Sequence, residues 1–78
     1  MEKMRTILEA NPGEEVLVTK IEAGRELKQR LAAMGLLPES KITVVRSVSQ
    51  GQVIVRLKDS RVVLGRGMAN KIFVTRSK

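Results

Sequence analysis

Apolar side chains recur along the chain in two patterns, one typical of β-strands and the other of an α-helix. Short segments rich in β-branched residues predict strands, because branched side chains pack well on a pleated surface. The segments of this kind are residues 16–21, 41–48, 52–57, 61–64 and 71–75. We therefore expect a mainly β domain of about five short antiparallel strands.

Residues with restricted or unusual backbone preferences separate these strands. Pro12 and Gly13 indicate a turn ahead of the first strand, because proline fixes φ and glycine tolerates positive φ. Residues 6–10 predict a single turn or a short strand, and residues 65–70 predict one tight helical turn. The remaining breaks are short enough to join antiparallel neighbours, and they lie at residues 49–51 and 58–60.

Residues 24–34 have helical spacing instead. Leu27, Leu31 and Met34 follow one another at intervals of four and three residues, so they share one face of a helix. The sequence therefore predicts one α-helix inserted between the first two of the main strands.

The end of this helix is marked by a glycine. Gly35 stands where a helix commonly ends in a left-handed residue, and Pro38 prevents the helix from resuming. Counting back from Gly35 makes Leu31 and Leu36 the pair that touches across a Schellman cap. We expect both leucines to meet at this helix end.

So many short strands in one small chain favour a barrel, because closure removes the sheet edges that invite aggregation. A chain of 78 residues has room for one hydrophobic core, so we expect residues 1–78 to form a single domain. The expected core consists of Val16, Val18, Ile21, Leu27, Leu31, Ile42, Val44, Val53, Val55, Leu57, Val63, Leu64, Ile72 and Val74.

The chain contains neither cysteine nor histidine. It therefore has no disulfide, and it lacks the commonest zinc ligands and the commonest general base. Serine residues are present, but no imidazole can activate them. Glu14, Glu15, Glu39 and Asp59 are candidates for a hard cation only because they are acidic, since they show no ligand spacing. We predict a protein that is not an enzyme and that has no catalytic, metal-binding or cofactor-binding residues.

Lysine and arginine outnumber aspartate and glutamate by 15 to 8, which gives a formal net charge of +7. Such an excess favours acidic partners: nucleic acid, anionic lipid or an acidic protein surface. The basic residues are dispersed, and Phe73 is the only aromatic side chain that could stack on a base. A basic nucleic-acid-binding barrel is therefore the less favoured alternative to a protein-binding module.

The sequence has no apolar run of about 20 residues, the length that a membrane-spanning helix needs. We expect a cytoplasmic protein without direct membrane insertion. Exposed strand edges can pair between copies of the chain, so the sequence leaves a homo-oligomer as an alternative to a monomer.

Apolar residues gather where the expected helix ends. They follow one another within four positions, so only part of the group can pack inward, and basic residues of the helix lie nearby. An apolar patch with a basic rim is typical of a protein-docking surface. The candidate protein-binding residues are Arg25, Lys28, Arg30, Met34, Leu36 and Leu37.

The segment GRELKQRLAAMGL, at residues 24–36, combines glycine, leucine, Arg-Leu and Met-Gly-Leu at a characteristic spacing. In this it resembles the FeoA family, the small ferrous iron transport proteins A of bacteria. The similarity covers nearly the whole chain. Further matches lie at Pro12-Gly13, at Leu37-Pro38, in VVLGR at 62–66 and in ANKIFV at 69–74.

The resemblance implies an SH3-like β-barrel with an inserted helix. It also implies an accessory or regulatory role in ferrous iron uptake. The implied partner is the cytoplasmic part of ferrous iron transport protein B, a membrane transporter with a GTP-binding domain. The same barrel occurs as the C-terminal domain of metal-dependent repressors, so a metal-responsive regulatory domain is a further alternative.

Overall fold

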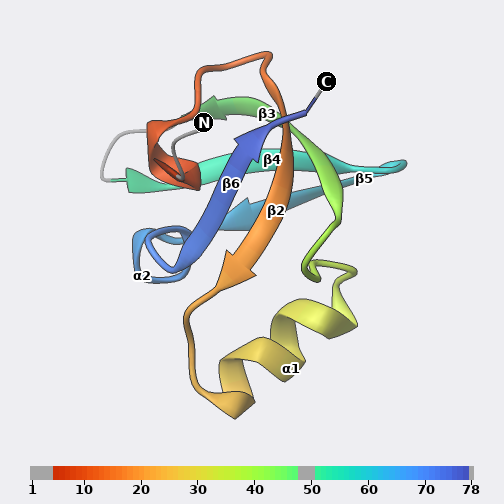
Figure 1. The fold of residues 1–78 in the computed structure, drawn as a ribbon. Helices are drawn as coiled ribbons and strands as arrows, with labels where there is room; N and C mark the ends of the chain where they lie inside the picture. Colours follow the sequence, from red (N-terminus) through yellow and green to blue (C-terminus); the bar gives the residue numbers. More distant parts are fainter. Residues whose placement is uncertain (1–4, 48–50, 78) are drawn as a thin grey trace.

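The strands form one curved antiparallel sheet (Figure 1). The structure, a computed structural model, describes residues 5–47 and 51–77. Within these residues the sheet has six strands in the order β1-β6-β2-β3-β4-β5, and every paired neighbour is antiparallel. The strands are β1 Arg5–Thr6, β2 Glu15–Ile21, β3 Lys41–Ser47, β4 Val53–Leu57, β5 Ser60–Leu64 and β6 Ile72–Arg76.

Helical segments join some of these strands. They are the 3₁₀ helix η1 Ile7–Glu9 and the α-helices α1 Arg25–Ala33 and α2 Arg66–Ala69. Figure 1 shows α1 beyond the end of β2, at one end of the sheet. The predicted inserted helix and the predicted helical turn near residue 67 are confirmed as α1 and α2. The reversal expected at 49–51 lies mostly outside the described residues, as does the last residue of the strand expected at 41–48.

The sheet bends around the core, but its two outermost strands do not pair in the part of the chain that the structure describes. β1 and β5 end the strand order, and no pairing between them occurs within the described ranges. η1 and α2 contact each other instead. The mainly β fold with one inserted helix is confirmed, whereas strand closure of the expected barrel is not seen in this part of the chain.

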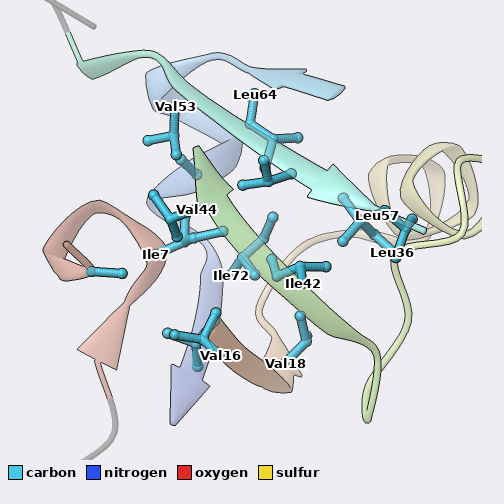
Figure 2. Packing of buried hydrophobic residues seen from close by; sticks show 14 of the residues in the cluster. Ile7, Val16, Val18, Leu36, Ile42, Val44, Val53, Leu57, Leu64 and Ile72 are labelled. Atoms are coloured by element: carbon cyan, nitrogen blue, oxygen red, sulfur yellow. The ribbon is translucent and has the colours of Figure 1, made fainter. Parts of the chain in front are cut away.

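Buried aliphatic side chains from every strand except β1 fill the inside of this bend, as Figure 2 shows for the centre of the cluster. Strand alternation explains which residues face inward: in β4, Val53, Val55 and Leu57 are buried while Arg56 is exposed. The buried residues are Ile7, Ala10, Val16, Val18, Ile21, Leu31, Leu36, Ile42, Val44, Val53, Val55, Leu57, Leu64, Ala69, Ile72 and Val74.

The core differs from the sequence prediction at a few positions. Val63 was expected inside but is 59% exposed, because its cross-strand partner in β4 is Ile54, on the face opposite the core. Leu27 is only partly buried and packs against the edge of the core. Ile7 and Ala69 are buried although they belong to short helical segments without strand or helix periodicity.

Helix α1 ends in the predicted Schellman cap. The N–H of Leu36 donates to the carbonyl of Leu31 at 2.8 Å, and the N–H of Gly35 donates to the carbonyl of Ala32 at 2.9 Å. Gly35 has a φ of +94°, and Leu31 and Leu36 are both fully buried. A Cβ atom at Gly35 would lie 2.8 Å from Cδ2 of Leu57, so the end of β4 packs directly on this cap.

Candidate functional site

A groove of about 650 Å³ runs between α1, the second half of β2 and the segment that follows α1. Pockets of this volume commonly accept ligands or peptide side chains. Arg25, Lys28, Leu36 and Leu37, which the sequence predicted as protein-binding residues, all belong to its lining.

Helix α1 presents one face to this groove. Arg25, Lys28, Gln29 and Ala32 line it, and their spacing of three, four and seven residues places them on one side of the helix. Leu31 lies on the neighbouring side and packs into the core.

The other two predicted residues lie elsewhere. Arg30 and Met34 are exposed, with Met34 at 38%, but neither belongs to the groove lining. Their spacing of four residues places them together on another side of the helix end. The structure therefore brings together four of the six candidates and leaves this pair on a separate surface.

A β-bulge turns part of β2 toward the groove. The register of β2 against β6 shifts between Val18 and Lys20, so Thr19 and Lys20 are both exposed although they are adjacent. Both residues line the groove, and the hydroxyl of Thr19 donates to the carbonyl of Phe73 at 3.1 Å. This bulge was not predictable from local sequence patterns, because it depends on pairing with a strand more than 50 residues away.

Leu37 is held at the groove by a tight turn. The N–H of Ser40 donates to the carbonyl of Leu37 at 3.0 Å, with Pro38 and Glu39 as the central residues. Glu39 has a φ of +79°, as the second central residue of a type II turn requires. The side chain of Leu37 remains 49% exposed.

Further hydrogen bonds fix this turn to its surroundings. The Ser40 hydroxyl accepts from the N–H of Leu37 and donates to the carbonyl of Gly35, each at 3.0 Å. The N–H of Glu39 donates to the carbonyl of Val18 at 2.6 Å, and the N–H of Val18 donates to the carbonyl of Ser40 at 2.8 Å. The exposed Leu37 therefore sits on a backbone that is fixed on both sides. The sequence pattern did not predict that Ser40 would hydrogen-bond the backbone of this turn. The available signal was a serine two residues after a proline.

Leu36 has a different role from its neighbour. It also contributes to the lining, but the residue as a whole is fully buried in the core. It packs beneath the surface of the groove, so a bound partner would contact the side chain of Leu37 and not that of Leu36.

The rim of the groove is cationic. Lys20, Arg25 and Lys28 contribute to it, and the only ion pair that they make within the described residues joins Nζ of Lys20 to Oε2 of Glu22 at 2.8 Å. An apolar centre with a cationic rim suits a partner segment that combines apolar and acidic side chains.

Away from the groove, a cluster of charged side chains joins the first and last strands. Oε2 of Glu14 lies 2.7 Å from a guanidinium nitrogen of Arg5 and 4.0 Å from Nε of Arg76, and Oε1 accepts from the N–H of Asn11 at 2.9 Å. The hydrogen bond from Arg5, followed by the one from Asn11, holds the pKa of Glu14 below its ordinary value. Because two arginines occupy this carboxylate, it serves strand attachment rather than cation binding.

The acidic residues considered as cation ligands do not come together. Across residues 5–47 and 51–77, no group of three or more acidic, histidine or cysteine side chains is placed to hold a metal ion. In the same ranges, no helix has the length and apolar character needed to cross a bilayer.

The fold and the groove define a small β domain with an open groove that has an apolar centre and a cationic rim. The chain belongs to the FeoA family: the sequence model of the FeoA domain matches residues 5–76. The family resemblance found in the sequence is thus confirmed, and with it the prediction of a non-enzymatic accessory protein.

Individual relatives agree with this assignment. A protein of Methanocaldococcus jannaschii named Fe(2+) transport protein A is 48% identical over 65 residues, which are 83% of this chain and 78% of the relative. A crystal structure of an iron uptake regulatory protein (FeoA) superposes with a TM-score of 0.87 at 29% identity, covering 96% of this chain and all of the other. A manganese-dependent transcriptional repressor also superposes with a TM-score of 0.87, at 23% identity, but this chain covers 44% of it and shares only the fold.

Proposed function

We propose that this protein serves ferrous iron uptake by docking on the cytoplasmic part of the membrane transporter, ferrous iron transport protein B. Membership of the FeoA family and the 48% identity to a protein named Fe(2+) transport protein A support the role in iron uptake. The observation that carries docking is Leu37, half exposed on a fixed turn above a cationic groove.

Two parts of the groove contribute to docking in different ways. The exposed half of Leu37 supplies about 1 kcal/mol when a partner covers it. Arg25 and Lys28 attract acidic residues of the partner and raise the association rate more than the final affinity. This division predicts an association rate that falls with salt and a dissociation rate that depends on Leu37.

The decisive experiment measures binding of purified Leu37→Asp to the cytoplasmic region of the transporter. The carboxylate removes the apolar contact and repels an acidic partner, so the Kd should rise by about tenfold or more. Circular dichroism and thermal unfolding should match the parent protein, because the side chain is outside the core.

Met34→Asp is the matched control. It makes the same chemical change on an exposed apolar residue that does not line the groove. It should bind as the parent protein does. If Met34→Asp lost binding while Leu37→Asp bound fully, the docking surface would lie on the other side of α1 and not at the groove. If the parent protein itself did not bind, docking on this transporter would be refuted.

A further inference from the structure

A second surface lies on the outer face of β3, β4 and β5, away from the core. Cross-strand pairing sets Arg46 opposite Ile54, and Ile54 opposite Val63. The same face carries Arg56 directly opposite Arg61. Two aliphatic side chains therefore lie among three arginines.

The arginines of this surface lack carboxylate partners in the part of the chain that the structure describes. Arg46, Arg56 and Arg61 are exposed, and the ion pairs among the described residues join other side chains. Like charges that face each other across an antiparallel pair destabilise the sheet. Bound anionic groups would relieve the repulsion between Arg56 and Arg61.

The backbone beside these arginines is also open. β5 ends the strand order, so no strand pairs with its outer side within the described residues. A two-residue turn, Lys58 and Asp59, connects β4 to β5 and closes on the pair Leu57 and Ser60. Because a β-turn hydrogen-bonds its first and fourth residues, this pair is a hydrogen-bonded one.

The alternation of an antiparallel ladder then decides which backbone groups are open. Starting from Leu57 and Ser60, the next pair, Arg56 with Arg61, is not hydrogen-bonded, and neither is the pair that holds Val63. The N–H and C=O groups of Arg61 and Val63 therefore point away from β4, toward the open edge. The same two residues place their side chains on the outer face.

We propose that β5 is a docking edge for an acidic, extended segment of a partner protein, which binds as an additional strand. Backbone hydrogen bonds to Arg61 and Val63 supply the pairing. An apolar side chain of the segment packs on Val63, which is 59% exposed, and its carboxylates bind Arg56 and Arg61. This surface is distinct from the groove and does not depend on the proposed iron-uptake role.

Charge and chemistry favour this occupant over two others. A second copy of this chain would bring another set of arginines to the edge. The arginines could bind the phosphates of a nucleic acid, but this face has no aromatic side chain on which a base could stack. Phe73 is the sole aromatic residue, and it belongs to β6. Aliphatic side chains between arginines instead match a strand in which apolar and acidic residues take turns at every second position, since those positions share one face.

The test titrates the ¹⁵N-labelled full chain with an end-blocked peptide of about eight residues in which Glu and Val take turns at every second position with Thr between them (Glu-Thr-Val-Thr repeated), so that both reach the same face of the added strand. We expect the amide signals of Arg61 and Val63 to shift and to gain protection from hydrogen exchange. Arg56→Gln/Arg61→Gln should weaken binding by about tenfold, since it removes two charge-assisted contacts. Arg25→Gln/Lys28→Gln removes the same charge from the groove and should bind the peptide as the parent protein does.

Several outcomes would overturn the proposal. They are the absence of peptide binding at low salt, equal binding by Arg56→Gln/Arg61→Gln, and shifts confined to the groove. An oligonucleotide that binds this face when the peptide does not would identify a nucleic-acid surface instead. Shifts at β5 that depend on protein concentration alone would identify a self-association edge. Arg46→Gln leaves the Arg56 and Arg61 pair intact, so we expect this second variant to lose less peptide affinity than Arg56→Gln/Arg61→Gln.

Discussion

At the scale of single residues, Gly35 has the strictest requirement. Its φ of +94° lies in the left-handed region, which side chains other than glycine adopt at a cost. The Cδ2 atom of Leu57 also occupies the place that a Cβ would take. Two independent reasons therefore select glycine at the helix end.

We predict that Gly35→Ala lowers the free energy of unfolding by about 2 kcal/mol. Urea denaturation of the two proteins measures this difference. Gly67→Ala is the matched control, because Gly67 lies in α2 with negative φ and nothing within 4 Å of an added Cβ. Equal stability of Gly35→Ala and the parent protein would contradict the strained cap.

At the scale of elements, the turn after α1 connects the helix, β2 and β3. Ser40 makes two side-chain hydrogen bonds to the backbone of this turn, and its own backbone pairs with Val18 of β2. The turn therefore positions Leu37 relative to the groove through several independent contacts.

Ser40→Ala should lower the free energy of unfolding by about 1 kcal/mol, because both bonds of the hydroxyl are lost. It should also weaken transporter binding, since Leu37 is no longer fixed. Calorimetric unfolding and the same binding assay measure the two effects. Ser60→Ala, at an exposed serine whose side chain makes no hydrogen bond within the described residues, should change neither.

Local patterns predicted most of the elements because those elements depend on neighbouring residues. The spacing of Leu27 and Leu31 and the position of Gly35 were sufficient for α1 and its cap. The exposure of Val63 was not predictable, because which face it occupies is set by the register of β4 and β5. The split between Leu37, on the groove, and Met34, off it, likewise depends on how α1 sits against β2.

At the scale of the whole molecule, Glu14 joins distant parts of the chain. It precedes β2 and binds Arg5 of β1, with Arg76 of β6 also near. β1 pairs with β6, so this cluster secures the first and last strands to the centre of the sheet. Such contacts are non-local, and the sequence did not reveal them.

The lowered pKa of Glu14 gives stability a pH dependence. The unfolded chain takes up a proton at the ordinary carboxyl pKa and the folded chain only at a lower pH, so the stabilisation is present above the ordinary pKa. It is lost as the pH falls through the lowered pKa. Thermal unfolding between about pH 6 and pH 2 should show this loss.

Glu14→Gln should be less stable than the parent protein near neutral pH and should lose less on acidification. Glu26→Gln, on the exposed side of α1, keeps the Arg5 contact and should retain the parent's acid sensitivity. A parallel fall in stability for Glu14→Gln and the parent protein would show that the cluster does not carry the acid dependence.

The hydrogen-bonded turn at Leu37 also has a thermodynamic consequence for recognition. A loop that becomes ordered only when its partner arrives must give up conformational entropy at that moment, which weakens the complex. Here folding has already immobilised that backbone through the contacts of Ser40 and Val18. The surface around Leu37 is preorganised, so the proposed docking would not carry the entropic cost of ordering this turn.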